Sequence, residues 1–334
     1  MSHKAASILD PKTYRDPRLK ESLLQLREWM GPRRGERPEG YLNLDKYFYA
    51  YIAYYLPLHL PELYWILEQL AKKDFPLSTK NVLDVGCGPG TLTLSLLLWL
   101  EKQQQAKPEK IVLWDNSQKA LALAKEKILK LNASDATKIF SEKVKLPNFA
   151  KNDERFDLIV VGHFLNEWGA GPRFRAKKIS FLNSLVKAKL SAEGTLIVIE
   201  PPLKECTLDL MQLRNELART LTIVAPCPQS DKLCPMLEQN LGWCYAQPPR
   251  EAFRKAGIAP FDAQLEKLLK IQLTHPGFSY FAATKKTYRA PACNVFVSEQ
   301  RKSGDLSCEV SGKIVETKSR SLHRGEIRSA FDKV

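Results

Sequence analysis

The amino-acid sequence predicts an α/β protein in which a parallel sheet is covered by helices on both faces. Two observations support this prediction, and a third indicates a separate β module at the C-terminal end. Short apolar segments such as NVLDVG (81–86) and KIVLWD (110–115) alternate with longer segments of helical periodicity, which is typical of strands buried on both faces. A glycine-rich loop, LDVGCGPGT, continues the first of these strands and precedes a helical segment. From about residue 288 the chain contains only short β-like runs.

Two segments precede the predicted sheet. Residues 1–40 are polar and rich in Pro, Arg and Glu, so we expect a basic arm that is mobile or wraps irregularly. Residues 41–75 are dense in Tyr and Leu at helical spacing, and Pro57 and Pro61 are expected to break this helical extension into at least two helices. We interpret the tyrosines as packing between helices, with stacking on RNA bases as the alternative.

Residues 76–287 form the predicted main domain. Its strands are expected at 81–86, 110–115, 156–164 and 194–200, and its helices at about 91–104, 117–131, 173–190 and 206–221. The segment FSYFAATKK (278–286) is expected to close the sheet, after an insertion at 224–250 that contains three cysteines. Residues 288–334, with the runs CNVFVSE, DLSCEVSG and KIVETKSR, are expected to form a small β module packed on this domain.

The charge and the N-terminal sequence limit the classes of function. The 334 residues include 51 basic and 37 acidic side chains, a net charge of +14, which favours an anionic partner such as RNA. No run of about eighteen uncharged apolar residues occurs, which argues against a membrane span. The N-terminus lacks the apolar core of a secretory signal, and Asp10 and Asp16 argue against a transit peptide. We therefore expect a cytoplasmic monomer, mitochondrial if the source is a eukaryote.

Basic residues near both ends of the chain are the candidates for phosphate contacts. Ordinary solvated charge explains any one of them equally well. They are Arg33, Arg34 and Arg37 in the N-terminal arm and Arg301, Lys302, Arg320, Arg324 and Arg328 in the β module.

The glycine loop is the strongest single motif. Its glycines, Gly86, Gly88 and Gly90, follow the pattern G-x-G-x-G, with Asp84 two positions before the first. This differs from the dinucleotide fingerprint G-x-G-x-x-G. It resembles the nucleotide loop of class I S-adenosylmethionine-dependent methyltransferases, and Asp115 at the end of the next predicted strand stands where it can accept hydrogen bonds from ribose hydroxyls. The resemblance implies their Rossmann-like, doubly wound sheet. The alternative is a structural turn that binds nothing.

No catalytic residue is assigned. The segment VVGHFLNEW ends the expected strand at 156–164 and supplies His163, Asn166 and Glu167. The Asn/Asp-Pro-Pro-aromatic motif of base-amine methylases is absent there, and no cysteine directly follows this strand or the next one at 194–200, as a cytosine-C5 enzyme would require. We expect His163 to line the cofactor pocket or to pack against it, with action as a base as the alternative.

Cys227, Cys234 and Cys244 fall within eighteen residues. A cytosolic compartment is reducing, so disulfides are not expected, and three thiolates held close together favour a soft metal. A fourth ligand would come from Cys293, Cys308, Cys206 or His275. Cys87, Cys206 and Cys293 also suit the role of small buried apolar side chains.

The motifs VAPCP, a second CP, WC with a following Arg, YIAYYLP, HFLNE, VIEP and FSYFA resemble one family. It is the methyltransferase-like family of the mitochondrial ribosomal small subunit and its bacterial relatives, and the likeness covers about residues 40–320. The resemblance implies a [4Fe–4S] cluster held by Cys227, Cys234 and Cys244, with Cys308 preferred over Cys293 as the fourth ligand. Zinc is the alternative metal.

The resemblance also implies the function. We expect an S-adenosylmethionine-binding, iron–sulfur factor that contacts small-subunit rRNA or its precursor on the small ribosomal subunit. Two roles stay open, methylation of the rRNA and non-catalytic assembly. A small-molecule methyltransferase is a third and less favoured hypothesis, because a net charge of +14 has no evident use in binding a small substrate.

Overall fold

The computed structural model describes the chain from residue 18 to residue 329 with internal gaps. The gaps are 32, 34–35, 39, 133–135, 151, 228–232, 250–265, 271–276, 289–292, 297–304, 309–313 and 318–326. Within 293–329 the backbone of four strands is described, and their side chains are not.

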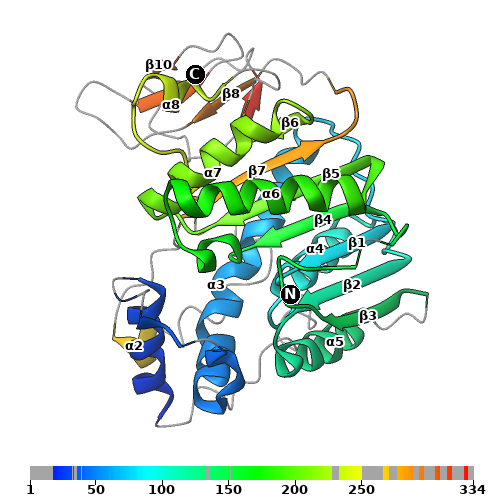
Figure 1. The fold of residues 1–334 in the computed structure, drawn as a ribbon, viewed down its shortest axis with the longest axis vertical. Coiled ribbons are helices and arrows are strands. Elements are labelled where there is room, and N and C mark those ends of the chain that lie inside the picture. Colours follow the sequence, from blue (N-terminus) through cyan, green and yellow to red (C-terminus); the bar gives the residue numbers. More distant parts are fainter. Residues whose placement is uncertain are drawn as a thin grey trace.

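A seven-stranded sheet in the order β3-β2-β1-β4-β5-β7-β6 forms the centre of the molecule (Figure 1). Its strands are β1 (Asn81–Val85), β2 (Lys110–Asp115), β3 (Lys138–Lys143), β4 (Phe156–Gly162), β5 (Leu190–Glu200), β6 (Thr222–Ala225) and β7 (Ser279–Thr284). Neighbours are parallel from β3 through β5, whereas β7 is antiparallel to both β5 and β6. The predicted α/β class and the late strand at 278–286 are thereby confirmed.

Helices cover both faces of the sheet (Figure 1). On one face lie α3 (Asp45–Ala71), α4 (Thr91–Lys102) and α5 (Gln118–Asn132), and on the other lie α6 (Pro172–Lys189) and α7 (Lys204–Leu217). Alternate residues of one strand serve the two cores: Val82 of β1 belongs to the core with α4, and Leu83 to the core with α6. This period of two explains why the strands read as continuous apolar runs.

The strand order reverses between β1 and β4. From β1 the chain continues outward to β2 and β3, and then returns to place β4 on the other side of β1. At such a switch point, the loops after the carboxyl ends of neighbouring strands diverge and leave a crevice for a ligand. The glycine loop, Asp115 and His163 therefore come to one edge of the sheet.

The prediction that prolines divide the helical extension was wrong. α3 is a single helix of 27 residues that contains both Pro57 and Pro61. Nineteen of its residues are buried, and this tertiary packing outweighs the cost of two lost backbone hydrogen bonds. One backbone donor finds a partner outside the helix, since the N–H of Tyr64 bonds to Oγ of Ser95 on α4. The predicted packing role of the tyrosines is confirmed for Tyr47, Tyr54 and Tyr55, which are buried.

Several elements were not predicted. The helix α2 (Leu19–Met30) lies within the expected arm and buries Leu23, Leu26 and Trp29 against α3. The edge strands β3 and β6 were also missed. Short 3₁₀ turns, η3 (Tyr41–Asn43) and η4 (Leu165–Trp168), precede α3 and follow β4, and a short helix, α8 (Pro235–Glu238), follows Cys234.

The C-terminal strands form a second sheet. β8 (Cys293–Phe296), β9 (Asp305–Cys308), β10 (Ile314–Thr317) and β11 (Ile327–Ser329) pair antiparallel in the order β10-β9-β8-β11. In Figure 1 this sheet lies at the end of the molecule opposite α2. None of the helices in the described parts of the chain is long and apolar enough to cross a membrane.

Candidate functional site

The glycine loop joins β1 to α4 at the reversal of strand order. Gly86, Gly88 and Gly90 have φ values of 68°, 52° and 80°, a region that side-chain-bearing residues rarely adopt. The backbone N–H groups of Gly86 and Cys87 both donate to the carbonyl of Trp114 on β2. The loop is therefore held against the neighbouring strand.

The loop glycines meet different surroundings. A Cβ added to Gly86 would lie 2.9 Å from Cβ of Phe164, and one added to Gly90 would lie 3.0 Å from Cβ of Ala124. A Cβ on Gly88 would meet nothing within 4 Å. Gly86 and Gly90 thus permit close packing, while Gly88 borders open space.

Two aspartates hold this region together. Asp115 Oδ2 accepts a hydrogen bond from the N–H of Gly88, and its Oδ1 accepts one from the N–H of Ser117, both at 2.8 Å. Asp84 Oδ2 accepts two hydrogen bonds from Thr93 in the first turn of α4, from the backbone N–H and from Oγ1. The other oxygen of Asp84, Oδ1, is buried without a hydrogen-bond partner. Burial raises the pKa of Asp84 to about 6 and also raises that of Asp115.

A cavity of about 360 Å³ lies above these residues. Of the six residues predicted to bind a cofactor, Gly86, Gly88, Asp115 and His163 line it. Asp84 and Gly90 do not line the cavity. They hold the loop in place instead. Asp84 accepts a hydrogen bond from Thr93, and Gly90 packs closely against Ala124.

His163 follows β4 in a left-handed conformation, with φ of 54°. Its backbone N–H donates to the carbonyl of Ile199 on β5 at 2.8 Å, and its Nε2 lies 2.6 Å from Oε2 of Glu62 on α3. The turn that follows is fixed by Glu200, whose carboxylate accepts hydrogen bonds from the N–H groups of Leu165 and Asn166. A strained, non-glycine residue held from two sides is a feature of functional sites.

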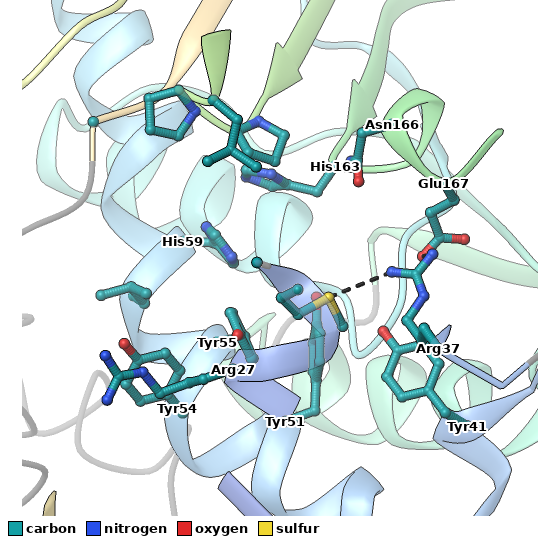
Figure 2. A pocket seen from close by; sticks show the side chains of 17 residues that line it. Arg27, Arg37, Tyr41, Tyr51, Tyr54, Tyr55, His59, His163, Asn166 and Glu167 are labelled. Atoms are coloured by element: carbon teal, nitrogen blue, oxygen red, sulfur yellow. Dashed lines mark hydrogen bonds and ion pairs between the residues drawn. The ribbon is translucent and has the colours of Figure 1, made fainter. Parts of the chain in front are cut away.

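A second cavity, of about 280 Å³, adjoins the first (Figure 2). The two share Arg37, Tyr41, Tyr51, His163 and Glu167 as lining residues. The sequence did not reveal this cavity, because the spacing of its tyrosines was interpreted as packing between helices, with stacking on RNA bases as the alternative.

The structure places Arg37 in the wall of the two cavities. Its side chain is 11% exposed, and its Nη2 lies 3.4 Å from Oε1 of Glu167 in the wall of the two cavities. Arg33, in contrast, is exposed and pairs with Glu36. Arg34, Arg301, Lys302, Arg320 and Arg324 lie outside the described residues, as does the side chain of Arg328.

Around the cysteines, the structure places two buried cations. Lys73 is 1% exposed, and its Nζ donates to the carbonyls of Val224 and Cys227. Arg214 is 3% exposed and shares the side chain of Asn215 with the backbone N–H of Cys234. Burial, together with the nearby Cys227, raises the pKa of Cys234 to about 11, whereas Arg214 acts in the opposite direction.

The three predicted metal ligands differ in exposure. Cys234 is buried, whereas Cys227 and Cys244 are half-buried. In the described part of the chain, their sulfurs do not all lie within 4.8 Å of one another. Sulfurs bound to one zinc ion at about 2.3 Å would be about 3.8 Å apart, so at least one of these sulfurs would have to move for all three to bind a single zinc.

The candidates for a fourth ligand are only partly described. Cys308 ends β9, opposite Val295 of β8 and Ile314 of β10, and Cys293 begins β8. The side chains of both lie outside the described residues, as does His275. Cys87 and Cys206 are both buried, as predicted, and Cys87 belongs to the apolar core beside α4.

Comparison with known proteins gives one family and several distant structures. The family model described as "Mitochondrial small ribosomal subunit Rsm22" matches residues 46–323. No curated protein matches the chain.

Three of the similar solved structures are methyltransferases. Magnesium protoporphyrin IX methyltransferase from Synechocystis PCC 6803, with bound S-adenosylmethionine, is 14% identical, with a TM-score of 0.42 over 79% of this chain and 97% of that one. The plantazolicin methyltransferase BpumL is 12% identical, with a TM-score of 0.41 over 82% and 98%. The ribosomal protein L11 methylase of Lactobacillus delbrueckii subsp. bulgaricus is 20% identical, with a TM-score of 0.33 over 49% and 70%.

Proposed function

Because the chain belongs to the Rsm22 family of the mitochondrial small ribosomal subunit, we propose that it binds S-adenosylmethionine and an iron–sulfur cluster and methylates the rRNA of that subunit. The observation that carries this proposal is the cavity enclosed by the glycine loop, Asp115 and His163 at the reversal of strand order. S-adenosylmethionine, when bound, supplies an activated methyl group.

The residues around this cavity fit the cofactor. Gly88 leaves open space where a ligand can approach the backbone closely. Each oxygen of Asp115 accepts one backbone hydrogen bond and has a second lone pair left for a ribose hydroxyl.

The adjoining cavity supports methyl transfer to a base. It is lined by Tyr41, Tyr51, Tyr54 and Tyr55 (Figure 2), and unpaired RNA bases are commonly bound by stacking on aromatic side chains. Since the two cavities share His163, a base held among the tyrosines would lie beside the methyl donor.

Non-catalytic assembly is the second candidate. It is favoured by the segment after β4, GHFLNEW, which lacks the Asn/Asp-Pro-Pro-aromatic motif. The amide-bearing residue there, Asn166, is 5% exposed, and its backbone N–H is occupied by Glu200.

The cysteine stretch supports the iron–sulfur part of the proposal. A four-thiolate cluster carries net negative charge, and the buried cations Lys73 and Arg214 lie beside Cys227 and Cys234. A cluster of several iron atoms also spans sulfurs that are too far apart for one zinc ion. We propose Cys308 as the fourth ligand, which would tie the C-terminal sheet to the larger one.

Methyl transfer tests the proposal. Small subunits and their precursors from cells without this protein are incubated with methyl-labelled S-adenosylmethionine and wild-type protein, Asp115→Ala, or the control Asp153→Ala, which changes an exposed aspartate. We expect label in the rRNA with the wild type and the control and none with Asp115→Ala. Binding of subunit and cofactor without label would favour the assembly role, and absence of subunit binding would contradict both.

A further inference from the structure

Three side chains meet at the wall between the two cavities. His59 and Glu62 stand at i and i+3 on α3, which places them on one face of the helix. His163 approaches from the end of β4. Nδ1 of His59 lies 2.8 Å from Oε1 of Glu62, and Nε2 of His163 lies 2.6 Å from Oε2 of the same carboxylate. The ligand atoms of all three residues lie within 4.8 Å of one another.

The carboxylate of Glu62 is buried between the two imidazoles. Glu62 is 2% exposed, and each of its two oxygens is engaged by one imidazole nitrogen. Within the described residues, the ion pairs of Glu62 are those with the two imidazoles, and no lysine or arginine pairs with it. A buried carboxylate needs a positive charge nearby, which here is either a proton on an imidazole or a metal ion.

The donor set favours a metal ion. Two imidazole nitrogens and one carboxylate are the ligands of many zinc sites and of non-haem iron sites. The ligands are also held in place before any ion binds. His163 is fixed by its backbone bond to Ile199, and the two imidazole rings lie against each other with centroids 3.9 Å apart. His59 also stacks on Tyr55, with ring centroids 5.6 Å apart.

The cluster has an open side. Both His59 and His163 line the tyrosine cavity, and Figure 2 shows the two rings at its inner wall. His163 also lines the cavity of the glycine loop. Three protein ligands with one open position distinguish reactive zinc sites from closed structural ones.

We infer that His59, Glu62 and His163 bind a divalent transition-metal ion, with zinc as the first candidate, whose remaining coordination position faces the tyrosine cavity. The ion binds through Nδ1 of His59, Nε2 of His163 and the carboxylate of Glu62. It takes the place of the protons in the two hydrogen bonds between Glu62 and the imidazoles. Its open coordination position can then act as a Lewis acid toward a polar group of a molecule in the cavity. This site is separate from the cysteine stretch and does not depend on the proposed methyl transfer.

Titration with Co²⁺ tests the site, because cobalt ligated by nitrogen and oxygen gives weak visible bands without the strong near-ultraviolet charge transfer of thiolate ligation. The full-length protein is treated with chelator, titrated with Co²⁺, and then challenged with Zn²⁺. The variants are Glu62→Gln and His59→Gln, and the control is Glu167→Gln, which changes a carboxylate in the wall of the same cavity. The cysteines are present in every variant, so their contribution cancels in the difference spectra.

We expect one equivalent of Co²⁺ with a nitrogen–oxygen spectrum in the wild type and the control, displaced by Zn²⁺. Loss of an outer-shell partner alone weakens metal binding about 10–100-fold, so loss of a ligand should weaken it about 100-fold or more. Zn²⁺ should also raise the melting temperature of the wild type and not of the variants. If Glu62→Gln does not fold, His59→Gln decides. A wild type without this spectrum, or variants that retain it, would overturn the assignment and leave a hydrogen-bonded triad.

Discussion

The carboxylate of Asp115, at the end of β2, accepts a hydrogen bond from the backbone N–H of Gly88, with 2.8 Å between Oδ2 and N. Asp115 ends β2, whereas Gly88 lies in the loop that follows the neighbouring parallel strand β1, 27 positions earlier in the sequence. This bond joins the acid expected to bind ribose to the one loop glycine that borders open space.

Replacement of Asp115 by alanine should abolish binding of the cofactor. The variant loses the acceptor for the ribose hydroxyls and the anchor of Gly88. Hydrogen bonds to a charged group contribute about 1.5–3 kcal/mol each, so two of them correspond to a loss of about 100-fold or more. Calorimetric titration with S-adenosylhomocysteine measures this, with Asp153→Ala as the control. Normal affinity in Asp115→Ala would remove Asp115 from the site.

Alanine at Gly86 and at Gly88 should have different effects. Both positions have positive φ, which costs an alanine about 1–2 kcal/mol. At Gly86 the new Cβ also collides with Phe164, so we expect the larger loss of stability in urea denaturation. At Gly88 the Cβ meets open space, so we expect a smaller loss of stability and a larger loss of cofactor affinity. Equal effects on both quantities would contradict the separate roles assigned to these glycines.

The stability of the cofactor-free protein should depend on pH through Asp84. Burial raises its pKa from 3.8 to about 6 in the folded state, so between these values the folded protein binds more protons than the unfolded chain. The contribution of Asp84 to the free energy of unfolding therefore falls as pH rises through this window and is constant above it.

Asp84→Asn removes this dependence and keeps the size of the side chain. The free energy of unfolding of the variant, minus that of the wild type, should increase by about 2 kcal/mol from pH 4 to pH 7. Urea denaturation at a series of pH values measures the difference. A difference that stays constant with pH would show that Asp84 titrates at its ordinary value in the folded protein.

Substitution of single cysteines tests the proposed cluster. Protein purified without oxygen should contain iron and acid-labile sulfide, and both should be lost in Cys227→Ser, Cys234→Ser and Cys244→Ser. Cys206→Ser is the matched control, because Cys206 is buried on α7 and Cys308 is proposed as the fourth ligand in preference to it. Loss of iron in Cys308→Ser but not in Cys293→Ser would identify the fourth ligand, and the reverse would assign it to Cys293.

The parts that could be predicted from the sequence are those whose signal is local. β1, β2, β4 and the second half of β5 each contain a short apolar run, and the glycine loop and Asp115 lie directly at strand ends. The first residues of β5, LSAE, contain no apolar run and were not predicted as strand. β3 was missed because it lies at the sheet edge, where its six residues, KIFSEK, are mostly exposed or half-buried. α3 was predicted as broken because local proline rules take no account of the burial that keeps the helix intact.

The meeting of His59, Glu62 and His163 could not be predicted in this way. His59 and His163 are separated by most of the first half of the main domain, and only the packing of α3 beside β4 brings them together. A histidine on a helix and another after a strand carry no spacing rule of the kind that the glycine loop has. The second cavity escaped prediction for the same reason.

The RNA that this protein binds in cells shows whether it acts on the small ribosomal subunit, as proposed. The tagged, full-length protein is purified without oxygen from its own cells, and the RNA that accompanies it is sequenced beside that of a control protein of similar charge. We predict enrichment of small-subunit rRNA, strongest for precursor forms. No enrichment over the control would contradict the claim and leave a methyltransferase-like fold that serves a small-molecule substrate.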